Sequence, residues 1–196
     1  MRLINSAKFT AVLDANVLFP VVIRDYLIWL ALYDLYTPKW SQKLLEEFAT
    51  IFQKKGMDLT DEQIQRQVDL ITKACNHALV EDYENLIPSI HIKDENDRHV
   101  VAAAIKCNAN VIVTYNVKDF QSEYLVKMGL SVVDPDTFIA DMIDLSPEKC
   151  CDAFREMVLT KKRPPYDEQQ YIEIFRRNGL TQTANELTKY LEISRD

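Results

Sequence analysis

The sequence predicts an α/β fold in which helices flank a mostly parallel sheet, followed by an α-helical C-terminal extension. Two observations lead to this prediction. Short apolar strand-like segments alternate with helical segments over the first two thirds of the chain, which is typical of a parallel sheet with helices on both faces. Beyond Asp134 the strand signals stop and only helical patterns follow. We therefore expect a sheet-containing domain at residues 1–140 and a helical extension at residues 141–196.

The first strand is expected at residues 9–13, where a short apolar run ends at Asp14. Buried parallel strands have this composition and often deliver a polar residue at their carboxyl end. The long Leu-rich run at 21–35 favours a buried helix over a strand because of its length. A very short strand is expected directly after it, at 35–38.

Capping residues mark the next two helices. The Ser41 hydroxyl can accept a backbone N–H, so a helix is expected from there to near Gly56. Thr60 and Gln63 have the spacing of a capping box, which predicts a helical segment over residues 60–84.

In the middle of the chain, the sequence predicts a loop, a helix, a strand and a turn that follow one another directly. Asp94 or Asn96 is expected to cap the helix. Two helices and two strands are expected in the order helix, strand, helix, strand at residues 100–105, 111–113, 119–128 and 130–133. Further helices are expected after Asp134 at residues 138–143, 147–159, 167–176 and 181–191, with a linker at 161–165.

Composition and charge exclude several classes of protein. With 47% hydrophobic residues in 196, the chain has enough apolar material for one complete core, which excludes a disordered protein. Three glycines are too few for a Gly-rich phosphate-binding loop. The net charge of −7 gives no support for nonspecific attraction to nucleic acid, so nucleic-acid chemistry needs local sites or bound cations.

The cysteines and the N-terminal segment indicate a cytoplasmic protein. The four cysteines form no CxxC pair, which argues against a zinc site and favours reduced thiols. The first residues lack the pattern of a signal peptide, and no apolar run is long enough to span a membrane. We therefore expect no membrane partner.

Three acidic residues are expected at the carboxyl edge of the sheet. Asp14 ends the first strand, and Asp97 lies in the first turn of the helix that precedes the 111–113 strand. Asp119 follows that strand by a short turn. Because ligands of open parallel sheets bind outside the carboxyl ends of the strands, we expect these carboxylates to converge there.

A fourth acid is expected on the helix that begins after Ser41. Glu46 and Glu47 are adjacent, and the sequence leaves open which of them faces the site. Glu47 borders the apolar face of the helix, whereas Glu46 is interpreted as a solvated side chain. Asp94 is an additional acid, interpreted either as a helix cap or as a group that supports the other carboxylates.

A cluster of carboxylates is unfavourable at neutral pH unless protons or cations neutralise it. Mg²⁺ and Mn²⁺ prefer oxygen ligands, so such a cluster without His or Cys indicates one of these ions rather than zinc. A divalent cation polarises a phosphodiester and lowers the pKa of an attacking water. The acids therefore predict phosphodiester hydrolysis.

Four motifs, in this order, resemble those of PIN-domain ribonucleases, especially the VapC-type toxins of bacterial and archaeal toxin–antitoxin pairs. They are VLDANVLF at 12–19, the helix at 41–48, DENDRHVVAAA at 94–104 and VTYNVKDF at 113–120. The resemblance covers roughly residues 9–140. It implies a PIN-like parallel-sheet fold, RNA cleavage dependent on Mg²⁺ or Mn²⁺, and a small cognate antitoxin. The helical extension exceeds the minimal domain.

The resemblance also implies roles for individual residues. Four of them match the catalytic acids of the family: Asp14, Glu47, Asp97 and Asp119. The expected metal ligands among these acids are Asp14, Asp97 and Asp119. Three polar residues match those beside the metal site, where they would contact substrate: Asn16, Thr114 and Asn116.

Two other classes of function stay open from the sequence. One is a PIN-like module that binds RNA or protein without cutting it, although a repulsive acid cluster has no purpose in such a module. The other is a structure-specific DNA nuclease, because flap-type cleavage uses similar chemistry. A phosphatase has less support, since Asp14 is followed by Ala15 and Asn16 rather than by the DxD pattern.

Other notable residues are interpreted as structural. In a continuous helix His99 points about 200° away from Asp97, so it is interpreted as a packing or surface residue rather than a general base. The excess apolar side chains of the 21–35 helix, including Tyr26 and Tyr33, offer a surface for a homodimer or an antitoxin. The basic groups at 161–163 and 176–177 are either solvated charges or contacts for RNA phosphates.

Overall fold

The computed structural model describes residues 9–120 and 123–193, and its centre is a five-stranded parallel sheet. The strands are β1 (Thr10–Leu13), β2 (Thr37–Ser41), β3 (Leu79–Val80), β4 (Val111–Val113) and β5 (Ser131–Val133). They pair in the order β3-β2-β1-β4-β5, so β1 is central. Leu13 pairs with Val113 and Val113 with Val133, which aligns the carboxyl ends of these strands at one edge. The predicted fold class is confirmed.

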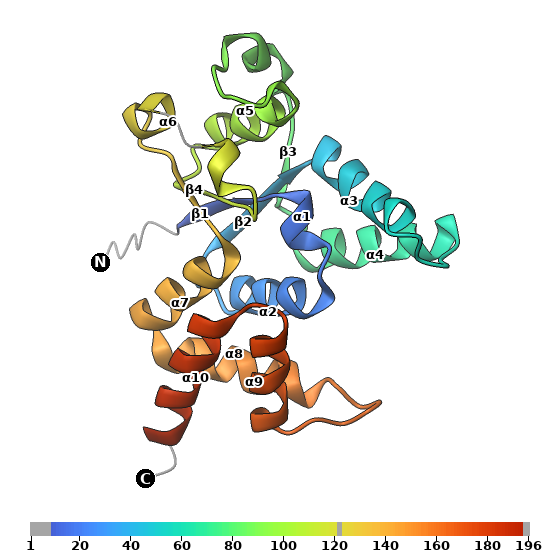
Figure 1. The fold of residues 1–196 in the computed structure, drawn as a ribbon, viewed down its shortest axis with the longest axis vertical. Helices are drawn as coiled ribbons and strands as arrows, with labels where there is room; N and C mark the ends of the chain where they lie inside the picture. The colour runs from blue at the N-terminus through green and yellow to red at the C-terminus, as the bar shows by residue number, and fades with distance from the viewer. Residues whose placement is uncertain (1–8, 121–122, 194–196) are drawn as a thin grey trace, which may run out of the picture.

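Helices cover both faces of the sheet and form a further layer on one side. The α-helices of the described residues are α1 (Ala15–Leu18), α2 (Val21–Leu32), α3 (Gln42–Lys54), α4 (Asp61–Ala74), α5 (Arg98–Lys106), α6 (Glu123–Lys127), α7 (Pro135–Leu145), α8 (Pro147–Leu159), α9 (Glu168–Arg177) and α10 (Thr181–Ile193). Short 3-10 helices are η1 (Glu84–Ser89), η2 (Glu95–Asp97) and η3 (Val117–Asp119). Figure 1 shows α5 on one side of the sheet and α2 on the other, with α8, α9 and α10 beyond α2. Across the described residues, every helix is too short or too polar to cross a membrane.

The predicted helix caps are present. The Ser41 hydroxyl accepts a hydrogen bond from the Leu44 N–H at 3.2 Å and begins α3 directly after β2. Thr60 and Gln63 form the capping box of α4. These caps satisfy backbone N–H groups that a helix start leaves without partners.

The largest differences from the sequence predictions concern three segments. β2 covers Thr37–Ser41 rather than 35–38, because these residues pair with β1 on one side and β3 on the other. The predicted helical segment at 60–84 is wrong beyond Ala74, where β3 and then η1 follow. The predicted helix at 119–128 is a 3-10 turn and the short α6 instead, and residues 121–122 lie outside the described residues.

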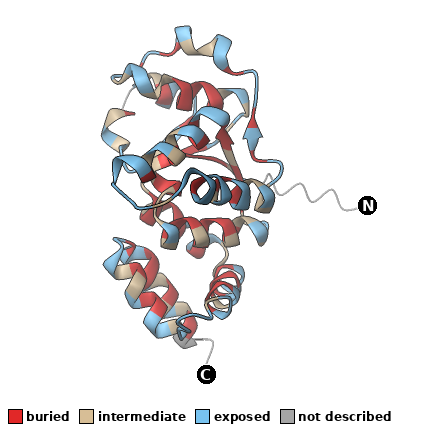
Figure 2. Cartoon of the chain, turned by 90° about the vertical axis from the view of Figure 1, so that its right-hand side faces the viewer, coloured by how far each residue is buried: buried red, intermediate tan, exposed pale blue. Residues whose placement is uncertain are grey.

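The C-terminal helices bury the apolar face of α2. The Tyr26 ring lies 5.9 Å from Phe154 and 5.3 Å from Phe175, and its hydroxyl donates to the Cys150 carbonyl at 3.0 Å. Tyr26 and Leu30 are completely buried. Figure 2 shows the buried sides of the lower helices facing one another and the rest of the chain. The prediction that this face of α2 is a homodimer or antitoxin surface is therefore wrong for these side chains.

Two of the predicted basic RNA contacts have partners within the chain. Lys161 forms an ion pair with Asp25 on α2, which joins the segment after α8 to α2. The Arg176 guanidinium contacts Glu173 at 3.4 Å and Asn185 on α10. These two side chains therefore form contacts within the C-terminal helices and between these helices and α2.

A buried carboxylate connects α7 to the start of α10. Asp136 accepts hydrogen bonds from the backbone N–H groups of Gln182 at 2.9 Å and Thr183 at 2.8 Å. Because the loss of a helix cap costs about 0.5–2 kcal/mol, we expect Asp136→Ala to lower the free energy of unfolding by about 1–2 kcal/mol. Chemical denaturation measures this change. The matched variant Asp144→Ala, on an exposed residue of α7, should change stability by less than about 0.5 kcal/mol; equal effects would contradict the capping role.

Candidate active site at the carboxyl edge of the sheet

The candidate site lies between β1 and β4, where the order in which the chain adds strands to the sheet reverses. The chain passes from β1 to β2 and β3 on one side, whereas β4 and β5 lie on the other. Such a switch point opens a crevice at the carboxyl ends of its two central strands. Asp14 follows β1 and Thr114 follows β4, and the Asp14 N–H donates to the Val113 carbonyl at 3.0 Å.

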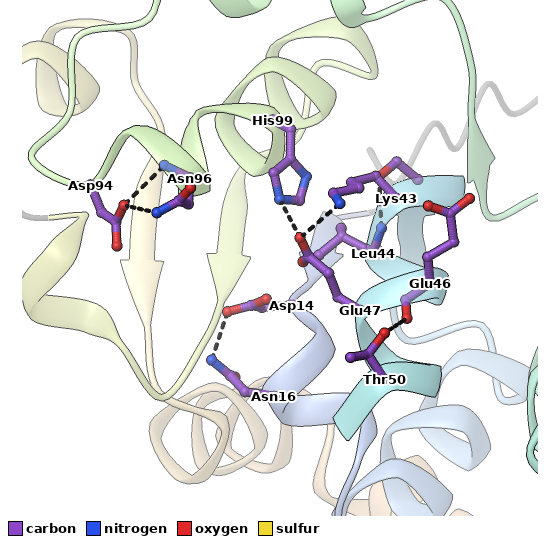
Figure 3. A network of polar contacts seen from close by, with 11 residues as sticks. Asp14, Asn16, Lys43, Leu44, Glu46, Glu47, Thr50, Asp94, Asn96 and His99 are labelled. Atoms are coloured by element: carbon purple, nitrogen blue, oxygen red, sulfur yellow. Dashed lines mark hydrogen bonds and ion pairs between the residues drawn. The ribbon is translucent and has the colours of Figure 1, made fainter. Parts of the chain in front are cut away.

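Hydrogen bonds fix the Asp14 carboxylate. Its Oδ2 accepts from the Thr114 hydroxyl at 2.6 Å and from the Asn16 side-chain amide at 2.7 Å. The side-chain oxygen of Asn16, Oδ1, accepts a hydrogen bond from the Tyr115 backbone N–H at 3.2 Å. The hydroxyl oxygen of Thr114 accepts one from the Asn116 backbone N–H at 3.0 Å. Figure 3 shows Asp14 beside Asn16. Asn16 and Thr114 thus lie beside Asp14 with their side chains, whereas Asn116 takes part through its backbone.

The structure places Glu47, rather than Glu46, at the site. Glu47 Oε1 lies 3.2 Å from His99 Nε2 and 3.8 Å from Lys43 Nζ. Glu46 is exposed and points away from His99, and its backbone carbonyl accepts from the Thr50 hydroxyl (Figure 3). The two acids diverge because consecutive side chains point in different directions around a helix.

Asp94 and Asp97 play different parts in the segment before α5. Asp94 accepts hydrogen bonds from the Asn96 N–H at 2.9 Å and from its side-chain amide at 3.0 Å, which makes Asp94 the cap of η2. Asp97 stands at the N-cap position of α5 but makes no capping hydrogen bond. Its half-buried carboxylate is therefore not accounted for by helix capping.

The shifts in pKa indicate that the carboxylates at this edge of the sheet repel one another. Burial, then the charges of Asp14 and Asp94, raise the pKa of Asp97 to about 6, and Glu47 adds to the increase. Burial also raises the pKa of Asp14. The hydrogen bonds from Thr114 and from the Ala15 backbone lower this pKa, and the charge of Glu47 raises it. Asp14, Glu47 and Asp97 therefore form one group of repelling carboxylates, which we call the acid group.

Asp119 lies at the end of η3, one turn beyond β4. Its Oδ1 is 4.0 Å from Lys93 Nζ, in the loop between η1 and η2. The contact is partly exposed and therefore weak. The structure brings Asp119 to the same edge of the sheet, with Lys93 rather than the acid group as its charged neighbour.

His99 is a residue whose place the sequence interpretation missed. It is buried, as a packing residue would be, but its ring contacts Glu47 and lowers the pKa of both Asp14 and Asp97. The separation of about 200° expected in a continuous helix does not apply here, because Asp97 belongs to a 3-10 turn and α5 begins only at Arg98. To predict the contact of His99 with the site, one would have to know from the sequence that the helix begins between positions 97 and 99.

The donor chemistry of this edge fits a divalent cation. Carboxylate oxygens dominate it, and a bound cation would relieve the repulsion that raises the pKa of Asp97. Among residues 9–120 and 123–193, no three His, Cys, Asp or Glu side chains are grouped closely enough to form a complete metal cage. A bound ion would thus require the acid side chains to turn toward it.

Comparison with known proteins identifies the family. A model described as "PIN domain" matches residues 10–118, which is more than half of the chain. The chain belongs to the PIN domain family. A second model, described as "VapC50 C-terminal domain", matches residues 135–189, from the first residue of α7 into α10. The resemblance found in the sequence motifs is confirmed.

One curated relative of this PIN domain protein is named "Putative ribonuclease VapC50" and comes from Mycobacterium tuberculosis. It is 33% identical over 91 residues, which cover 46% of this chain and 53% of the relative. The match therefore spans about half the length of that relative. No solved structure matches the chain.

Proposed function

We propose that this protein is a metal-dependent endoribonuclease that acts as the toxin of a toxin–antitoxin pair. The observation that carries the proposal is the acid group at the switch point of a PIN domain. Repelling, partly buried carboxylates favour a bound cation, and phosphodiester hydrolysis is a reaction that such cations promote. The name of the Mycobacterium tuberculosis relative supports the choice of RNA as substrate.

In this proposal Asp14, Asp97 and Asp119 hold Mg²⁺ or Mn²⁺. When bound, the ion supplies an activated water and neutralises charge on the phosphate. Thr114 and Asn16 keep Asp14 in one orientation, so Asp97 and Asp119 are the acids that would turn toward the ion.

The remaining predicted residues lie near the proposed place of the substrate; Thr114 is completely buried and would act through its hydrogen bond to Asp14. Glu47 is the acid that accepts a hydrogen bond from the attacking water. Asn16, Thr114 and Asn116 border the place where the scissile phosphate would lie, since all three belong to the hydrogen-bond network of Asp14.

The proposed partners are RNA and a cognate antitoxin protein. A basic side chain of the antitoxin, such as Arg, would suit the acid group because a guanidinium offers several donors to carboxylates. A homodimer stays a prediction, and it would need a surface other than the buried face of α2. The division of the chain at residue 140 also stays a prediction; α7 runs through that point and would be shared by both parts.

The test is cleavage of RNA by the purified protein with Mg²⁺, with Mn²⁺ and with excess chelator. We expect 5′-phosphate and 3′-hydroxyl ends, because water rather than the ribose 2′-hydroxyl attacks. A 2′,3′-cyclic phosphate, or full activity in chelator, would contradict the mechanism. Binding without cleavage would favour the non-catalytic module, and cleavage of branched DNA alone would favour the DNA nuclease.

A pair of neighbouring substitutions tests the site itself. We expect Glu47→Gln to lower kcat by about 10²-fold, as the loss of a catalytic carboxylate does. Glu46→Gln makes the same chemical change one residue away on an exposed side chain and should leave kcat within about twofold. Equal effects of both substitutions would contradict the assignment of Glu47.

A further inference from the structure

The imidazole of His99 is a buried polar group to which the proposed mechanism gives no role. Only 7% of the residue is exposed. Neither ring nitrogen has an aligned hydrogen-bond partner among the described residues. Burying an unpaired polar group is unfavourable, so an apolar side chain would serve better if this position were needed for packing alone.

The close contact that His99 does make is with Glu47. Its Nε2 lies 3.2 Å from Glu47 Oε1, which is within hydrogen-bond distance, although the two groups are not aligned for a hydrogen bond. A small rotation of either side chain would align them. Figure 3 shows the ring reaching from α5 toward the Glu47 carboxylate on α3.

Glu47 has a weaker partner on its own helix. Lys43 Nζ lies 3.8 Å from the same oxygen, but the lysine side chain is 53% exposed. Exposed ion pairs four residues apart hold their side chains loosely. His99 is buried and belongs to α5, which packs on β1, β2 and β4, so its position is set by the core.

We propose that His99 is a positioning residue that donates from Nε2 to Glu47 and holds this carboxylate toward Asp14 and Asp97. An imidazole can carry a hydrogen on Nε2 whether the ring is neutral or protonated, so an N–H donor at this atom matches the observed contact. The inference rests on the proposed function, because it explains how one acid of the proposed site is kept in place. Glu47 is not one of the proposed metal ligands, but its negative charge acts on Asp14 and Asp97, so its displacement should weaken cation binding as well as catalysis. Outer partners that orient the acids of a metal site change metal affinity or activity by about 10–100-fold when removed.

The experiment compares His99→Leu and His99→Gln with the wild type in the full-length protein. Mn²⁺ is titrated into metal-free protein by calorimetry, and RNA cleavage is measured as kcat and KM. We expect His99→Leu to weaken Mn²⁺ binding by about 10-fold and to lower kcat with little change in KM. His99→Gln should restore most of both values, because its amide can place an N–H near the position of Nε2.

Thermal melts of the metal-free variants separate positioning from packing. A positioning residue predicts that His99→Leu melts at or above the wild-type temperature while it binds Mn²⁺ more weakly. A purely structural role predicts a lower melting temperature with unchanged Mn²⁺ affinity of the folded protein, and that result would overturn the proposal.

Two further variants test whether the effect passes through Glu47. Lys43→Gln removes the exposed partner and should change Mn²⁺ affinity and kcat by less than about twofold. The double variant Glu47→Gln/His99→Leu should equal Glu47→Gln alone, because coupled positions are not additive; additive losses would overturn the proposal. A wild-type protein that binds no Mn²⁺ and cuts no RNA would refute the proposed function. If the wild type does both, and His99→Leu has the same Mn²⁺ affinity and the same kcat, this inference alone would be refuted.

Discussion

Asp97→Asn should abolish RNA cleavage while leaving the metal-free protein as stable as the wild type or more so. The loss of activity should be at least about 100-fold, since removal of an outer partner alone costs up to that factor. Stability should stay unchanged or rise by about 1 kcal/mol, because the neutral amide relieves the cost of burying a charge and the repulsion with Asp14, Asp94 and Glu47. Asp97 makes no capping hydrogen bond that the substitution would break.

The pH dependence of this effect has a definite sign. The pKa of Asp97 rises from the usual 3.8 to about 6 in the folded protein, so between these values the native state binds more protons than the unfolded chain. The penalty from the charged carboxylate therefore grows as the pH rises from about 4 to 6 and is complete above that range. The stability advantage of Asp97→Asn should follow the same curve.

Thermal and chemical unfolding at pH 5 and pH 7, with chelator and with Mg²⁺, would measure these changes. Mg²⁺ should stabilise the wild type through binding to the native state and should stabilise Asp97→Asn much less. Asp94→Asn is the control for cleavage, since an asparagine can keep the cap of η2. Because the charge of Asp94 also raises the pKa of Asp97, this variant should relieve part of the same repulsion while it keeps activity. A loss of several kcal/mol in metal-free Asp97→Asn would identify Asp97 as structural and remove the catalytic assignment.

Phe154→Ala should lower the free energy of unfolding by about 3–5 kcal/mol, the usual cost of truncating a buried Phe. The ring is fully buried and lies 5.9 Å from Tyr26, 5.6 Å from Phe175 and 6.2 Å from Tyr171. These rings join α2 to α8 and α9. The substitution therefore opens a cavity between the sheet-containing part of the chain and its C-terminal helices.

Denaturant titration followed by circular dichroism and tryptophan fluorescence would measure the loss. Leu159→Ala, on the same helix at a side chain that is 70% exposed, is the control and should change stability by less than about 0.5 kcal/mol. A loss below about 1 kcal/mol in Phe154→Ala would contradict the packing role. Two separate transitions, with the C-terminal helices unfolding first, would support an independent domain after residue 140.

Local signals in the sequence were enough for many elements. The apolar run at 111–113 and the Pro-initiated helix at 147–159 match β4 and α8, because their lengths and first residues are marked by unambiguous residue types. β2 and β3 were harder to place. β3 has only two residues, too few for a periodic pattern, and both strands owe their positions to pairing with distant segments.

The residues near the candidate site also divide into those whose position is marked by the local sequence and those whose position depends on distant segments or helix boundaries. The position of Asp14 follows from the strand end that precedes it, and that of Glu47 from the apolar face of α3; their roles stay predictions. The position of His99 depended on where α5 begins, and helix boundaries are the least certain part of a sequence prediction. The burial of Tyr26 depended on helices more than 120 positions later in the chain, for which local periodicity gives no information.

The hydrogen bond between Asp14 and Thr114 also determines when the site forms during synthesis. Thr114 is 100 positions after Asp14, and β1 lacks one of its two neighbouring strands until β4 has been made. A growing chain that ends at η2 contains all three residues of the acid group but not the strand that completes their edge of the sheet. If the protein is the toxin that we propose, a nascent chain is harmless until β4 has been made, and an inhibitor is needed only after this strand has joined the sheet.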